Sequence, residues 1–163
     1  SYVVEPLIKG GSQQDGKRAG TLNTMGVIST KLALDDLKKT YKSRECYQGI
    51  EFLRKELKSF LGVKGKIIGE NSPQLNSNTL FFTVKGRDSN SLLMAFDLNQ
   101  MDVGIGSACS SGITAPNRIL LGLGHDETTA KSGLRLSFGP DLNLEKAKAY
   151  WIQIEKVLKR VIR

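Results

Sequence analysis

Apolar side chains recur at every third or fourth position in two long stretches of the chain. One stretch covers residues 43–61 and the other covers residues 144–161. This spacing brings the apolar side chains to one side of an α-helix, so each stretch predicts an amphipathic helix. The first predicted stripe is Tyr47, Ile50, Leu53 (or Phe52), Leu57 and Phe60, and the second is Ala147, Tyr150 or Trp151, Ile154, Leu158 and Val161. A weaker helical pattern covers residues 22–37, and Asn143 is the expected N-cap of the last helix.

In the middle of the chain, the spacing of the apolar residues becomes shorter. Strands and short helices are expected there. Four segments predict β-strands: residues 65–70, 79–85, 103–109 and 133–138. In the last of them, leucines and a phenylalanine alternate with Arg135 and Ser137, which is typical of a strand with one buried face. Two short helices are predicted, over residues 91–100 with Ser89 or Asn90 as the cap, and over residues 116–123 with Pro116 near the first position. This order of elements favours an α/β domain in which helices pack on one face of a short, mainly antiparallel sheet.

The length and composition are those of an ordinary folded domain. The chain has 163 residues, 39% of them hydrophobic and 25% charged. This length fits one domain, or a small domain together with the tail of a larger one. No apolar run approaches the ~20 residues that a membrane-spanning helix needs, and no signal peptide is expected at the N-terminus.

The charge balance is strongly basic. Lys and Arg number 24 against 16 Asp and Glu, giving a formal net charge of +8. Such a balance fits a solvated basic surface, an acidic protein partner or nucleic acid. The basic residues are spread along the chain and the aromatic residues, at 7%, are not interleaved with them. Nucleic-acid binding therefore ranks last among the three interpretations.

The two cysteines have different surroundings in the sequence. Cys109 lies in a run of small residues, GIGSACSSG over 104–112, whereas Cys46 lies within a predicted helix and is interpreted as structural. Glycine and serine leave the backbone free and the sulfur uncovered, so Cys109 is a candidate mobile nucleophile, although a free cysteine is more often a small buried apolar residue. Their spacing suits no metal site, and both are expected to be free thiols in a reducing compartment, the cytoplasm.

The single histidine is expected to have a structural position. His125 follows the sequence Gly-Leu-Gly at the end of a predicted helix. An acid–base role is compatible with this position, but the end of a helix near a turn is the preferred interpretation. No potential metal ligands cluster with it in the sequence.

Three segments resemble the signatures of one enzyme family. Residues 10–23, GGSQQDGKRAGTLN, resemble the GG-x-QE-x-G-x-RSGT-x-N signature of cysteine desulfurases. Residues 106–112, GSACSSG, are similar to the loop that carries the active-site cysteine of that family, and residues 134–139, LRLSFG, are similar to its R-x-S-x-G substrate-binding strand. The segments occur in the family's order and spacing. The resemblance covers essentially the whole chain and identifies it with the C-terminal portion of a NifS/IscS-like cysteine desulfurase, a fold-type I enzyme dependent on pyridoxal 5'-phosphate.

The resemblance implies conversion of L-cysteine to L-alanine with sulfur left on the enzyme. Cys109 matches the nucleophile that receives this sulfur as a persulfide, and the resemblance also implies that it can be a transient iron–sulfur ligand. Arg135 matches the arginine that holds the substrate carboxylate, for which a guanidinium is suited by its paired donors. From the residues alone, Arg135 could instead form a surface ion pair. Thr21 matches the threonine that reaches the cofactor phosphate of the opposite subunit. The implied partners are an iron–sulfur scaffold or another sulfur acceptor, and a second copy of the full-length enzyme.

The chain departs from the family pattern at three positions. Gln14 replaces the usual glutamate, Ala19 replaces the usual serine, and Asn117 stands where serine is common. These changes affect the fine structure of the first loop. Arg18 and Gln13 are motif residues that we expect to order the first loop rather than to take part in catalysis.

The family's cofactor-bearing lysine, ring-stacking histidine and paired aspartate cannot be assigned in this chain. The chain is therefore expected to be part of a longer enzyme and to be inactive alone. Residues 1–24 would be the cofactor-facing loop and the end of the large domain, and residues 25–163 the small C-terminal α/β domain with its connecting helices. Two further interpretations stay open: a selenocysteine lyase or related pyridoxal-phosphate enzyme, and a non-catalytic persulfide carrier or interaction module with an acidic partner.

Overall fold

A computed structural model describes residues 5–40, 45–72, 78–106 and 115–162 of the chain. Two compact units are distinguished, Ser1–Thr40 and Tyr41–Arg163. The first helix falls within the first of these units, and the expected boundary after residue 24 stays a prediction. Whether the first 24 residues belong to a larger cofactor-binding domain stays a prediction.

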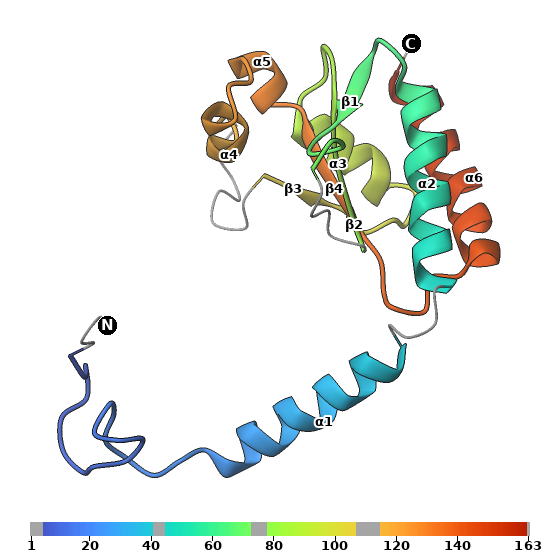
Figure 1. Ribbon diagram of the computed structural model, residues 1–163. Coiled ribbons are helices and arrows are strands. Elements are labelled where there is room, and N and C mark those ends of the chain that lie inside the picture. The colour runs from blue at the N-terminus through green and yellow to red at the C-terminus, as the bar shows by residue number, and fades with distance from the viewer. Residues whose placement is uncertain (1–4, 41–44, 73–77, 107–114, 163) are drawn as a thin grey trace. The chain divides into compact units, whose positions relative to one another are not determined.

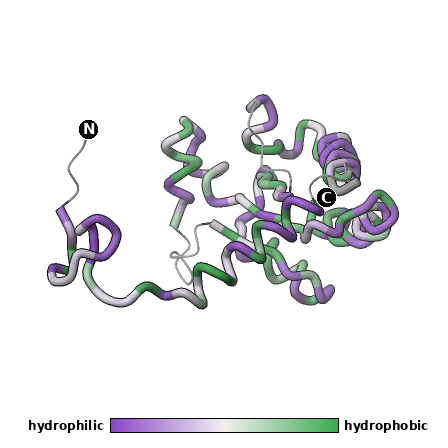
Figure 2. The backbone as a smooth tube through the Cα atoms, turned by 60° about the horizontal axis from the view of Figure 1, so that its bottom comes forward, coloured by the Kyte–Doolittle hydropathy of each residue, from purple (hydrophilic) through white to green (hydrophobic). Residues whose placement is uncertain are grey.

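The first unit consists of an irregular loop and the helix α1, Thr24–Thr40. Asn23 begins this helix, because its side-chain oxygen accepts a hydrogen bond from Gly26 N at 2.9 Å. Apolar and polar residues are interspersed along the whole helix (Figure 2). Leu22 just before the helix is exposed, and so are the large apolar residues within it: Met25, Val27, Ile28, Leu32, Leu34 and Leu37. Such a concentration of uncovered apolar surface is typical of a helix that packs against further protein.

The second unit is built on a four-stranded sheet. The strands are β1 (Gly65–Ile67), β2 (Thr79–Val84), β3 (Gly104–Ile105) and β4 (Gly133–Ser137), in the spatial order β1-β2-β4-β3. All three neighbouring pairs are antiparallel, which confirms the predicted kind of sheet. The strands β1 and β3 are shorter than the predicted segments, and the part of the latter that contains Cys109 lies outside the described residues.

Three helices share one apolar core with one face of this sheet. They are α2 (Glu45–Leu61), α3 (Ser89–Asp97) and α6 (Leu144–Val161), and α2 lies beside α6 (Figure 1). The core residues include Leu57, Phe96 and Ile154 from the helices and Phe82 and Leu134 from the strands, all almost completely buried. Burial of each such side chain stabilises the fold by roughly 1.5–3 kcal/mol. The predicted packing of helices on one face is therefore confirmed.

Two short helices are also found among the described residues of the second unit. They are α4 (Arg118–Gly122) and α5 (Glu127–Ala130), and α5 was not expected from the sequence. Leu120 of α4 lies near the sheet face that the long helices leave open, since its Cδ1 would be 3.4 Å from a Cβ at Gly133. We call this face of the sheet the open face.

Several details of the predicted elements are corrected by the structure. The cap of α3 is Asp88 rather than Ser89 or Asn90, because the Asp88 carboxylate accepts a hydrogen bond from Ser91 N. Pro116 precedes the helix instead of opening it, because Asn117 is the N-cap of α4. In the helical stripes, Leu53 is buried whereas Phe52 is half-buried, Trp151 is more buried than Tyr150, and Tyr47 is exposed. The bounds of α6 and its Asn143 cap agree with the prediction.

Candidate functional site

Arg135 lies in the middle of β4 with its side chain on the open face of the sheet. Leu134 and Leu136 on either side of it are buried, whereas Arg135 is exposed, as the alternation in the sequence predicted. Its partners in the neighbouring strands are Phe81 on β2 and Gly104 on β3. Side chains of paired residues share a face, so these two positions flank the guanidinium.

Gly104 leaves the space in which the guanidinium lies. A Cβ at this position would be 3.0 Å from Arg135 Nη2 and 3.2 Å from Nε. The missing side chain at residue 104 therefore allows Arg135 to lie across β3. The sequence suggested only a flexible backbone at Gly104, because the pairing of β3 with β4 cannot be deduced from local pattern.

A shallow pocket opens beside Arg135. It has a volume of about 290 Å³ and is lined by Asp102, Val103, Gly104, Arg135 and Ser137. Within the described part of the chain, no ion pair or hydrogen bond engages the Arg135 side chain, which disfavours the surface ion pair considered from the sequence. A guanidinium with free donors at a pocket is suited to a small carboxylate.

Cys109 lies outside the described residues, and so does most of the small-residue loop around it. The structure does describe the residues on both sides of this segment. Ile105 of β3 precedes Cys109 by four positions and pairs with Leu134, the residue next to Arg135. After the segment, the buried Asn117 accepts hydrogen bonds from Ile119 N and Leu120 N. Asparagine thus performs the capping that serine would perform at this position.

The loop of residues 5–23 is ordered by its own motif residues. Arg18 Nη2 donates to the carbonyl oxygens of Gly20, at 3.3 Å, and Thr21, at 2.9 Å, so Arg18 orders the loop as predicted. The Gln13 amide lies against Gly11, where a Cβ would be 2.5 Å from Oε1. Ala19 stands where the family usually has serine. Its side chain is buried, an environment that suits an apolar residue.

Thr21 is exposed at the end of this loop. It follows Gly20, whose φ of +92° favours glycine. A hydroxyl and neighbouring loop amides are the kinds of donor that bind phosphate, so the exposed Thr21 fits the phosphate end of pyridoxal phosphate. Because Thr21 and Arg135 belong to different units, the structure does not relate their positions.

His125 lies in the turn between α4 and α5. Its backbone N–H donates to Leu120 O at 3.0 Å, which closes the end of α4 as expected. Its Nδ1 is 3.1 Å from Nζ of Lys66 on β1, a contact between residues 59 positions apart. Among the described residues, no group of three or more potential ligands could hold a metal ion.

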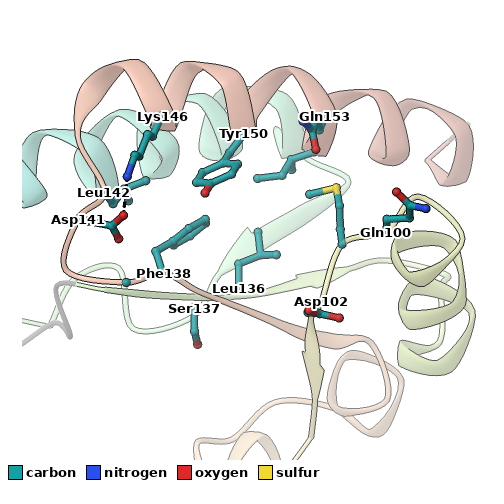
Figure 3. Close-up of a pocket in the computed structure, with 13 residues that line it drawn as sticks. Gln100, Asp102, Leu136, Ser137, Phe138, Asp141, Leu142, Lys146, Tyr150 and Gln153 are labelled. Carbon is teal, nitrogen blue, oxygen red and sulfur yellow. Dashed lines mark hydrogen bonds and ion pairs between the residues drawn. The ribbon is translucent and has the colours of Figure 1, made fainter.

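A second pocket lies between β4 and α6, next to the pocket of Arg135. Its volume is about 310 Å³, and Asp102 and Ser137 line both pockets. Leu136 and Phe138 point toward α6, whereas Ser137 points to the opposite side (Figure 3). The rings of Phe138 and Tyr150 are 6.0 Å apart. This pocket has both polar and apolar lining residues, and Arg135 is not among them, so we treat it separately from the pocket beside Arg135.

The rim of the second pocket carries an ion pair. Lys146 Nζ donates to Asp141 Oδ2 at 2.5 Å. This hydrogen bond lowers the pKa of the Asp141 carboxyl and raises the pKa of Lys146, with a smaller contribution from the attraction between the charges. Both groups are exposed, so the pair is screened by solvent.

Comparison with known proteins gives the class of this chain. No family model matches it. A NifS-like protein from Rickettsia africae has a similar solved structure, with a TM-score of 0.72 and 25% sequence identity over 97% of this chain and 41% of that one. The second unit is accordingly a small α/β domain of the kind found in fold-type I pyridoxal-phosphate enzymes, as the sequence resemblance implied.

Curated relatives give the family. An IscS-like cysteine desulfurase of Mycobacterium tuberculosis is 30% identical over 82% of this chain, and a cysteine desulfurase IscS of Clostridium botulinum is 29% identical over 96% of it. The chain belongs to the cysteine desulfurase family and corresponds to its C-terminal portion. It spans 34% and 40% of the length of these two relatives. Among the described residues, no helix combines the length and the hydropathy that a bilayer-spanning segment requires.

Proposed function

We propose that this chain is the C-terminal part of an enzyme that converts L-cysteine to L-alanine and retains the sulfur as a persulfide on Cys109. The observation that carries the proposal is the pairing of β3 with β4. Gly104 in the strand before the cysteine segment lies beside Arg135, which lines a pocket and has no hydrogen-bond or ion-pair partner among the described residues. A carboxylate held by Arg135 would thus bind next to the strand from which the Cys109 segment extends.

Arg135 binds and orients the substrate in this proposal. Two parallel hydrogen bonds from its guanidinium would hold the α-carboxylate, and Gly104 would keep the space for that arrangement. The Cys109 thiolate attacks the substrate's sulfur. An S–S bond forms as the C–S bond breaks, the electron pair of the C–S bond stays with the β-carbon, and that carbon takes up a proton to complete alanine. A loop of small residues suits a thiol that must later meet an acceptor.

The cofactor in this proposal is pyridoxal 5'-phosphate. When bound, it supplies an electron sink at the substrate's α-carbon. Thr21 would contribute a hydroxyl to its phosphate in the opposite subunit of a homodimer, and the rest of the longer protein would supply the lysine that carries it. The isolated chain should consequently be inactive. A stable cofactor absorption band with turnover of cysteine by the isolated chain would contradict this.

We also propose where the sulfur goes. The enzyme would act in the cytoplasm and pass the persulfide sulfur to a scaffold protein of iron–sulfur cluster assembly or to another acceptor. Cys109 would be a transient iron–sulfur ligand during that transfer. The relatives' names as cysteine desulfurases support sulfur transfer from cysteine, and the small-residue segment around Cys109 suits a thiol that must reach an acceptor.

The test compares alanine release from L-cysteine by the full-length enzyme and three variants. Cys109→Ser should abolish release, and mass spectrometry should find no added sulfur on the protein. Arg135→Lys loses the paired donors and should raise KM by about 10- to 100-fold with a smaller effect on kcat. Arg160→Lys, at an exposed position near the end of α6, is the matched control. An unchanged KM in Arg135→Lys would refute the assignment of Arg135, and faster turnover of selenocysteine than of cysteine would indicate a selenocysteine lyase.

A further inference from the structure

Two lysines face each other at the end of the β1–β2 pair. Lys64 precedes β1 and Lys85 follows β2, and Lys85 N donates to Lys64 O at 2.8 Å. The neighbouring pair Gly65 and Val84 shows that the two lysines are directly opposite. Both are exposed. Like charges directly opposite in an antiparallel pair destabilise the sheet, so this arrangement needs an explanation.

Lys66 and His125 extend the same charged surface. Side chains alternate along a strand, so Lys66 lies on the face of Lys64, which is the open face of the sheet. Its ammonium lies 3.1 Å from His125 Nδ1. A hydrogen bond here requires Nδ1 to be the acceptor, which leaves the proton on Nε2. The histidine thus adds a donor to three cationic side chains.

The carboxylates near this surface are engaged elsewhere. Asp88 caps α3 and Asp126 caps α5, and the hydrogen bonds that they accept from Ser91 and Thr129 lower the pKa of each. The ion pairs found in the described part of the chain use other lysines: Lys9, Lys17, Lys31, Lys58, Lys131, Lys146 and Lys159. Among the described residues, therefore, no carboxylate forms an ion pair with Lys64, Lys66 or Lys85.

We infer that Lys64, Lys66, Lys85 and His125 form a docking surface for an acidic, extended protein segment. Carboxylates two residues apart in an extended segment are separated by roughly 6.6 Å, which matches the spacing of Lys64 and Lys66 along their own strand. β1 is an edge strand, so such a segment can also pair with its main chain. The surface extends over only two strand positions, so it would contact few phosphates of a nucleic acid and release few counterions.

The test measures binding of a labelled peptide of alternating glutamate and glycine by fluorescence anisotropy. The chain should bind it at low salt, bind the matching glutamine peptide much more weakly, and lose affinity as salt rises. The double variant Lys64→Gln/Lys85→Gln should bind about tenfold more weakly, since two charge-assisted contacts are lost. The double variant Lys148→Gln/Lys156→Gln changes the net charge equally on exposed positions of α6 and should bind as the unchanged chain does.

Three outcomes would overturn the inference. The first is no measurable binding of the glutamate peptide. The second is an equal loss of affinity in both double variants, which would indicate a general effect of net charge. The third is tighter binding of a single-stranded oligonucleotide of the same charge than of the peptide, which would identify the surface as a nucleic-acid site.

Discussion

The close approach of α2 to the turn before α6 can be tested by adding one methyl group, through substitution of Gly49 by alanine. Gly49 lies within α2, and a Cβ there would be 2.8 Å from both Leu142 O and Leu142 Cγ, and 3.0 Å from Asn143 O. Alanine in an unobstructed helix interior stabilises by about 1 kcal/mol relative to glycine. Overpacking typically costs about 1–3 kcal/mol, and two of the three atoms are backbone oxygens that cannot rotate away. Because two of these distances are shorter than real Cβ contacts, the overpacking cost should lie in the upper half of that range, so the net effect of Gly49→Ala should be a destabilisation of about 1–2 kcal/mol.

Thermal unfolding followed by circular dichroism measures this difference. For a domain of this size, the expected loss lowers Tm by roughly 4–10 °C. Gly122→Ala is the matched control, because it also lies in a helix but a Cβ there has no atom within 4 Å. The control should be neutral or more stable by up to about 1 kcal/mol. If Gly49→Ala raised Tm as the control does, the described contact between α2 and the turn would be wrong.

Further predictions concern the core, the caps and the candidate site. Leu134→Ala, at a completely buried position, should destabilise the fold by about 2–5 kcal/mol in urea unfolding, and a loss below about 1 kcal/mol would argue against the described core. The pKa values of the Asp88 and Asp126 carboxyls are lowered, so their caps stabilise the fold at pH values above the usual carboxyl pKa of 3.8, and this stability is lost as pH falls through the folded-state pKa. Asp88→Asn should therefore make Tm less dependent on pH in that range. An unchanged pH dependence would contradict the assigned cap. Gly104→Ala should displace the Arg135 guanidinium without unfolding the sheet, so the full-length enzyme should show a higher KM for cysteine with an almost unchanged Tm.

Regular local patterns predicted much of the fold. The helix α6 begins and ends as expected, with Asn143 as its cap, because a long amphipathic repeat and a capping residue are both local signals. The alternation in β4 correctly placed Arg135 on the exposed face, because side chains in a strand alternate wherever the strand lies. Short elements were less predictable: α5 has only four residues, which is too few for a period to be recognised.

The neighbours of the candidate functional side chains were decided by the tertiary structure alone. Strand order and register join residues that are far apart in the sequence, and no local pattern reports them. The order β1-β2-β4-β3 brings Gly104 beside Arg135, and the turn after α4 brings His125 to Lys66. The sequence by itself therefore determined the family, the long helices and the face on which the candidate arginine lies. Only the folded sheet decided what surrounds that arginine, because cross-strand hydrogen bonds and side-chain packing are set by contacts between distant segments.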